Sequence, residues 1–182
     1  FFIFFYYAGV TERKLFPFIV RIILNLTNNN YPDLIRIATL TDIAEIQIVR
    51  NSVNENKLSS PDRVKDADVA EYLTHRGKGW VAVIDDKIIG FAIADLIGHS
   101  IWALFLLPEY EGRGYGNKLH QTMLDWYFSE SRDTLWLTTA ANTRAENFYN
   151  KHGWTEVNYS EAVIKFEMSY DEWIEYKMSE NG

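Results

Sequence analysis

The sequence predicts a mixed α/β fold whose central sheet is mostly antiparallel. Three observations lead to this prediction. Strand-like apolar runs alternate with segments of helical spacing, residues 80–96 contain two such runs around a tight turn, and a later apolar run enters a glycine-rich loop that continues into a helix. The chain has 182 residues, of which 47% are hydrophobic and 15% aromatic, which suffices for one domain with its own core.

The first elements follow a polar linker that ends near Pro32. Residues 34–38 alternate as a strand does. Asp42, with Glu45 three residues later, forms the pattern of a capping box and predicts the start of a helix. The apolar face of that helix consists of Ile43, Ile46, Val49 and Val53.

A second helical region and a hairpin come next. The helical region starts near Ser60 and is expected to break at Gly77 and Gly79. Residues 80–84 and 88–96 then form strand-like runs around a short Asp-rich turn, so we expect them to pair antiparallel.

The centre of the sheet is predicted from a strand–helix–strand unit. Residues 100–107 form a nearly continuous apolar run, typical of a strand covered on both faces. Residues 114–129 have helical spacing and residues 135–139 form the next strand, which indicates a parallel crossover.

The last part of the chain is expected to close the sheet. Residues 144–151 form a short helix that ends at Gly153, and residues 154–157 and 163–170 supply two antiparallel strands.

The loop with Gly112, Gly114 and Gly116 is the strongest functional signal. Glycine lets the backbone approach a ligand, and the N–H groups at the start of the following helix favour phosphate oxygens. A P-loop would need Gly-Lys-Ser/Thr, whereas the chain has Gly116-Asn117-Lys118, and a dinucleotide fingerprint would need glycine at position 117. The spacing therefore excludes the usual sites for ATP and NAD.

Two motifs together resemble the GCN5-related N-acetyltransferase superfamily. Residues 103–116, which include Pro-Glu-Tyr-Glu-Gly-Arg-Gly-Tyr-Gly, look like its acetyl-CoA pyrophosphate loop. Residues 142–154, with Asn142, Phe-Tyr and Gly-Trp, are similar to its second signature segment. The resemblance covers residues 35–170 and implies an acyl-CoA N-acyltransferase fold, with a splayed parallel strand pair at the site.

The resemblance also implies a function and a set of site residues. It implies direct transfer of an acetyl group from acetyl-CoA to the amine of a small molecule or peptide, with Tyr149 protonating the departing thiolate and no metal. The residues expected to bind acetyl-CoA are Phe105, Leu106 and Leu107 through their main chain, Glu111, Gly112, Arg113, Gly114, Tyr115, Gly116 and Asn142. From the residues alone, Tyr149 also fits a core aromatic and Asn142 a helix N-cap.

Glu111 departs from the family pattern, which has Gln or Arg at this position. Its negative charge opposes phosphate binding, and Arg113 or Lys118 are candidates to offset it. This departure keeps a second hypothesis open, in which the same fold serves as a non-catalytic acyl-CoA-binding or regulatory module.

The general base and the acceptor amine are not identified by the sequence. Asp95, His99, Glu109 and Glu71 are candidate bases, and a chain of waters is an alternative. His120 fits a solvated helix residue. Segments 51–68 and 157–162 are expected to set acceptor specificity, and a homodimer stays open.

Composition excludes several other classes. The net charge is −7 and no basic cluster is present, which disfavours nucleic-acid binding, and the absence of cysteine fits a reducing cytoplasm. Residues 1–30 form an apolar appendage whose runs fall short of the roughly 20 residues of a spanning helix, so a membrane anchor and secretion are both disfavoured. Residues 31–177 are expected to form the catalytic domain and 178–182 a tail.

Overall fold

The computed structural model describes residues 34–55, 60, 63–159 and 162–180. Residues 1–30, expected to be an appendage, lie outside these ranges, as do residues 181–182 of the expected tail. Among the described residues, no helix is both long enough and apolar enough to span a bilayer.

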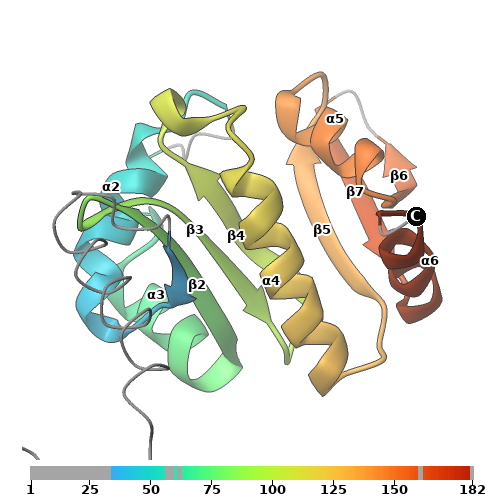
Figure 1. Ribbon diagram of the computed structural model, residues 1–182, viewed down its shortest axis with the longest axis horizontal. Helices are drawn as coiled ribbons and strands as arrows, with labels where there is room; N and C mark the ends of the chain where they lie inside the picture. Colours follow the sequence, from blue (N-terminus) through green and yellow to red (C-terminus); the bar gives the residue numbers. More distant parts are fainter. Residues whose placement is uncertain (1–33, 56–59, 61–62, 160–161, 181–182) are drawn as a thin grey trace, which may run out of the picture. The chain divides into compact units, whose positions relative to one another are not determined.

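Seven strands form one sheet in the order β1-β2-β3-β4-β5-β7-β6 (Figure 1). Neighbouring strands run antiparallel except for β4 and β5, which are parallel. This arrangement confirms the predicted fold class and the parallel crossover. The strands are β1 (Leu34–Ile37), β2 (Gly77–Ile84), β3 (Lys87–Asp95), β4 (Ser100–Leu106), β5 (Leu135–Ala140), β6 (Thr155–Tyr159) and β7 (Val163–Met168).

Helical segments connect the strands. The longest, α4, follows β4 and precedes β5 in the chain, and Figure 1 shows it packed across one face of the sheet. The segments are η1 (Leu40–Asp42), α2 (Ile43–Ser52), α3 (Asp66–Glu71), the π-helical turn η3 (Tyr72–Arg76), η4 (Pro108–Tyr110), α4 (Tyr115–Glu130), α5 (Arg144–Lys151) and α6 (Tyr170–Glu180).

The core is built on the central strand β3. Helices α2 and α4 both contact β3 and β4. Leu106 of β4 lies next to Gly116 of α4, whereas the ring of Phe105 lies under Arg50 of α2. Because successive side chains of a strand point to opposite faces, α2 and α4 cover opposite faces of the sheet. Fully buried residues of this core include Phe91, Ile46, Leu119 and Met123.

The first helical segment begins differently from the prediction. Thr39 is the N-cap of η1, and its capping box is closed by Asp42, whose carboxylate accepts the Thr39 backbone N–H at 2.7 Å. Asp42 is also the N-cap of α2 but makes no side-chain cap hydrogen bond to that helix. Arg36 donates two hydrogen bonds to the same carboxylate at 2.7 and 2.8 Å. Glu45 instead accepts the backbone N–H of Ile88. The predicted Asp42–Glu45 capping box is therefore wrong, because the Asp42 carboxylate already accepts hydrogen bonds from Thr39 and Arg36.

The helical segment η3 ends at Arg76 with Gly77 as its C-cap, which confirms the predicted break, and Gly77 and Gly79 both lie at the start of β2. Gly77 pairs with Asp95, and a Cβ at Gly77 would lie 1.8 Å from the Ala94 carbonyl oxygen. Glycine is needed here because two strands approach too closely for a side chain.

Helix α6 was not predicted. The strand expected to reach Tyr170 ends at Met168, and Ser169 and Glu172 then exchange hydrogen bonds as a capping box does. The helix continues to Glu180 and so includes the first residues of the expected tail.

Candidate active site

The parallel strands β4 and β5 separate soon after they meet. They pair at Ser100 with Trp136, where the Trp136 N–H also donates to the His99 carbonyl at 2.9 Å. Figure 1 shows the two strands diverging toward their carboxyl ends. Main-chain groups of β4 therefore border an open gap.

Hydrogen bonding to β3 decides which groups border the gap. The Leu107 N–H donates to the Ile89 carbonyl at 2.8 Å, and Phe105 lies opposite Phe91 in the same ladder. Main-chain groups alternate in direction along a strand, so those of Leu104 and Leu106 face the gap. Of the three predicted main-chain contacts, only Leu106 faces the gap, while Phe105 and Leu107 are directed toward β3.

The glycine loop forms an uncapped helix start. Gly112 and Gly114 have φ angles of 71° and 87°, the left-handed region that favours glycine, and a Cβ on either would meet nothing within 4 Å. Gly114 is the N-cap of α4, and no side chain bonds the first turn as a cap. The N–H groups of the first turn are thus available to an anion.

A cavity of about 560 Å³ lies beside this helix start, within the size range of small-molecule sites. Its walls come from β4, the glycine loop, α5 and the carboxyl end of α2. The lining residues are Val53, Glu55, Leu104, Phe105, Leu106, Glu111, Gly112, Gly114, Gly116, Asn117, Arg144, Ala145, Asn147, Phe148, Tyr149, Lys151 and His152.

The cavity brings together most of the predicted site residues. Seven of the eleven line it: Phe105, Leu106, Glu111, Gly112, Gly114, Gly116 and Tyr149. Leu107, Arg113, Tyr115 and Asn142 are not among the lining residues. Asn142 precedes Thr143, which is the N-cap of α5, so the predicted capping role belongs to Thr143.

Glu111 is neutralised by Arg144. The Arg144 Nη1 pairs with Glu111, and its Nε pairs with Glu55 at 3.3 Å. The Arg144 backbone N–H also donates to the Glu55 carboxylate at 2.9 Å. These interactions join the glycine loop, α5 and the end of α2 at the cavity.

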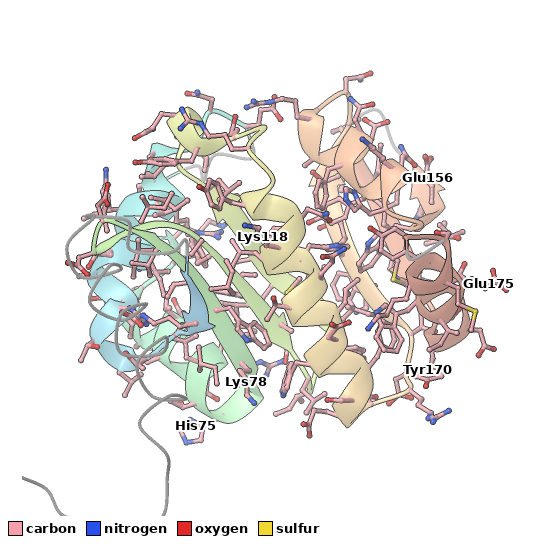
Figure 2. All side chains as sticks on the ribbon, in the orientation of Figure 1. His75, Lys78, Lys118, Glu156, Tyr170 and Glu175 are labelled. Atoms are coloured by element: carbon pink, nitrogen blue, oxygen red, sulfur yellow. The ribbon has the colours of Figure 1, made fainter. Side chains whose placement is uncertain are left out.

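The two cations expected to offset Glu111 interact elsewhere. The Arg113 guanidinium lies 5.3 Å from the ring centre of Tyr110, and the Lys118 ammonium lies 5.6 Å from that of Tyr115. Figure 2 shows Lys118 on α4. The sequence could not rank Arg144 above them because Arg144 is 33 positions from Glu111 and approaches it only in the fold.

Tyr149 is buried at the cavity wall. Its ring packs against Trp154 at 5.5 Å and Phe148 at 5.4 Å between centroids. Burial raises the pKa of the Tyr149 phenol above its ordinary value, so the hydroxyl keeps its proton at neutral pH. Tyr149 therefore both packs in the core and lines the cavity.

His120 is a core residue, contrary to the expectation of a solvated position. It is fully buried, and its Nε2 accepts a hydrogen bond from Trp154 Nε1 at 3.0 Å. Burial, with a smaller contribution from His152, lowers the pKa of His120 to about 3. The expectation was wrong because α4 packs both against the sheet and against Phe148 and Trp154. The helical spacing within α4 does not reveal this second contact.

None of the four candidate bases lines the cavity. Asp95 accepts hydrogen bonds from Arg76 and from the backbone of Ile97 and Gly98 in the β3–β4 turn. His99 bonds Tyr127 at 2.9 Å near the start of β4, the end at which the strands still touch. Glu71 pairs with His75, and Glu109 is exposed.

Sequence reasoning missed several cavity residues. Asn117 lines the cavity, and its Oδ1 is buried without a hydrogen-bond partner among the described residues. Phe148 and His152 stack with 4.0 Å between ring centroids on the α5 side. Phe148 and His152 are four residues apart, so they lie on one face of α5. This spacing could have indicated that both residues face the cavity.

Solved structures share this fold. A ribosomal-protein-S18-alanine N-acetyltransferase from Escherichia coli superposes with a TM-score of 0.65 and 17% identity, covering 76% of this chain and 94% of that one. PaiA N-acetyltransferase from Thermoplasma acidophilum, solved in complex with coenzyme A, gives a TM-score of 0.65 and 16% identity over 76% of this chain and 99% of that one. The fold is thus that of the N-acetyltransferases.

The sequence comparisons identify the family. The model of the acetyltransferase (GNAT) family matches residues 41–154, more than half of the chain, and the chain belongs to this family. A [ribosomal protein bS18]-alanine N-acetyltransferase of Haemophilus influenzae is 30% identical over 76 residues, which is 41% of this chain and 52% of that protein. An uncharacterized N-acetyltransferase of Archaeoglobus fulgidus is 35% identical over 80 residues, 38% of this chain and 54% of that protein. The chain spans about half the length of the curated relatives it matches.

Proposed function

We propose that this protein transfers an acetyl group from acetyl-CoA directly to the amine of a small molecule or peptide. The observation that carries the proposal is the cavity between the diverging strands, since it joins an uncapped helix start to an open strand edge. A pyrophosphate suits the N–H groups of a helix N-terminus. The extended arm of coenzyme A contains amides that can hydrogen-bond the unpaired main chain of β4.

The cavity residues fit acetyl-CoA. Gly112 and Gly114 leave open space where side chains would otherwise stand. The buried, unpartnered Oδ1 of Asn117 needs a donor, and the arm of coenzyme A carries amide N–H groups. Arg144 offsets the charge of Glu111, which removes the reason for preferring a non-catalytic module.

The chemistry requires few protein groups. The amine attacks the thioester carbonyl and a C–N bond forms, the C–S bond breaks, the nitrogen loses a proton to water, and the thiolate takes up a proton. The Leu106 N–H faces the gap and is placed to polarise the carbonyl. Tyr149 is the proton donor to the thiolate. Burial raises the pKa of the phenol, so Tyr149 is in its protonated form, able to donate, when the thiolate leaves.

The test is acetyl-CoA-dependent release of free thiol, with acetylated product identified by mass. The amine panel should include a peptide that begins with alanine, because the relatives from H. influenzae and E. coli are named for an alanine acceptor. Product from at least one amine supports the proposal. Saturable acetyl-CoA binding with no product from any amine in the panel would overturn it.

A further inference from the structure

Among the residues that the structure describes, Arg50 has no anionic partner. Its guanidinium carbon lies 5.0 Å from the ring centre of Phe105 and 5.6 Å from that of Trp102. The Nε and Nη1 atoms are buried and have no hydrogen-bond partner in the part of the chain that the structure describes. Burial lowers the pKa of the guanidinium, although an arginine remains charged at neutral pH.

Such a group is costly unless something binds it. A buried charged donor without an acceptor loses its hydration and gains nothing in return. Three other arginines of the described chain pair with carboxylates: Arg36 with Asp42, Arg76 with Asp95 and Arg144 with Glu111. Arg113 and Arg132 also stack on rings, but the buried, unbonded guanidinium atoms are those of Arg50. The rings of Phe105 and Trp102 hold the Arg50 guanidinium in place by cation–π contact but accept no N–H bond in its plane.

Arg50 is not itself a lining residue of the cavity, but it lies next to two residues that are. Phe105, on which it stacks, lines the cavity, and so does Val53 three residues further along the chain. Tyr72 stacks on Trp102 with 4.2 Å between ring centroids and so fixes the second ring. Arg50 belongs to the α2 face of the sheet, opposite the face on which α4 offers its N-terminus to phosphate.

We propose that Arg50 binds a carboxylate of the acceptor, so that the acceptors are amines that also carry a carboxylate, such as amino acids or acidic peptides. A guanidinium presents parallel N–H groups that match the two oxygens of a carboxylate. Because the site lies on the opposite face from the glycine loop, it is separate from the pyrophosphate site. This inference rests on the proposed acetyl transfer and narrows its substrate class.

The test compares acceptors that differ only in charge. A series of ω-amino acids of increasing length is measured against the corresponding amides, together with Ala-Glu against Ala-Gln and with phosphate-bearing amines. For at least one pair we expect kcat/KM for the acid to exceed that for the amide by about tenfold or more, as for a charge pair at a partly buried site. Equal values for acids and amides throughout, or a preference for phosphate-bearing amines, would overturn the inference.

Variants then locate the effect. Arg50→Gln and Arg50→Lys should both reduce the acid-to-amide ratio, because lysine keeps the charge but lacks the planar pair of donors. Arg132, which stacks on Tyr170 at 4.2 Å and takes no part in the cavity, is the matched control: Arg132→Gln should keep the wild-type ratio. A thermal shift with acetyl-CoA confirms that each variant is folded. No product from any acceptor would count against acetyl transfer itself, whereas product without an acid preference would count against Arg50 alone.

Discussion

Arg144 forms an ion pair with Glu111 across the cavity, from the first residue of α5 to the loop that precedes α4. The pair joins the two halves of the sheet where β4 and β5 no longer do. It also places the one unusual acidic residue of the glycine loop beside a compensating cation.

Removing the Glu111 charge should strengthen acetyl-CoA binding, whereas removing the Arg144 charge should weaken it. Glu111→Gln removes one of the two carboxylates that Arg144 contacts, so more of its charge acts on phosphate, and we expect the Kd for acetyl-CoA to fall about threefold. Arg144→Gln leaves two carboxylates at the cavity, and we expect the Kd to rise about tenfold. These magnitudes correspond to about 0.6 and 1.4 kcal/mol, in the range of partly exposed charge pairs. Calorimetric titration at low and high salt measures both, and a weaker-binding Glu111→Gln variant would contradict this account.

Tyr149→Phe separates proton donation from packing. The ring keeps its contacts with Trp154 and Phe148, while the hydroxyl at the cavity is lost. We expect kcat to fall about 10²-fold, the scale of one general acid, with acetyl-CoA affinity nearly unchanged. Steady-state kinetics with a direct binding measurement distinguishes the two effects. Unchanged kcat would remove Tyr149 from the mechanism.

His120 should make the fold sensitive to acid. Its pKa is lowered to about 3 in the folded protein, so between that pH and its ordinary value of 6.5 the unfolded chain binds the extra proton. Stability is therefore fully present above pH 6.5 and is lost as the pH falls, by about 1.4 kcal/mol per unit, or about 2 kcal/mol at pH 5. Urea unfolding of His120→Gln should show a flatter pH profile, because glutamine does not titrate.

The control for His120 is His75. His75 lies at the outside of η3 (Figure 2), and its side chain is 75% exposed. His75→Gln should leave the pH profile of stability as in the wild type. A profile that flattens equally in both variants would mean that acid sensitivity has another origin.

Gly114 and Gly116 should respond differently to alanine. Gly114 has a φ of 87°, so Gly114→Ala strains the backbone and should cost about 1–2 kcal/mol of stability. Gly116 lies in the first turn of α4, where a Cβ would come within 3.4 Å of Leu106. Gly116→Ala should keep stability but weaken acetyl-CoA binding at the cavity. Thermal unfolding with and without acetyl-CoA measures both, and a Gly114→Ala variant as stable as the wild type would contradict the strain.

Local patterns predicted the strands and the glycine loop well, because each depends on neighbouring residues. The apolar runs of residues 88–96 and 100–107 are properties of single strands. The helix start after Gly114 follows from the loop sequence itself. The site was then found through the order of its two motifs.

Long-range relationships were beyond local pattern. The buried state of His120 depends on Trp154, and the charge of Glu111 on Arg144, both more than 30 positions away. The choice between Leu104 and Phe105 as the gap-facing main chain depends on the register of β4 with β3. Residue type and spacing do not specify these pairings, because the fold brings the partners together.

The single pairing between Ser100 and Trp136 has an evolutionary consequence. In a continuous sheet, a residue inserted in one strand shifts the register of its neighbour and turns buried side chains outward. Here β4 and β5 share almost no ladder, so a change of length near the cavity on one side leaves the other side in register. The half of the sheet beside the glycine loop and the half beside Tyr149 can therefore change in length separately without loss of strand register.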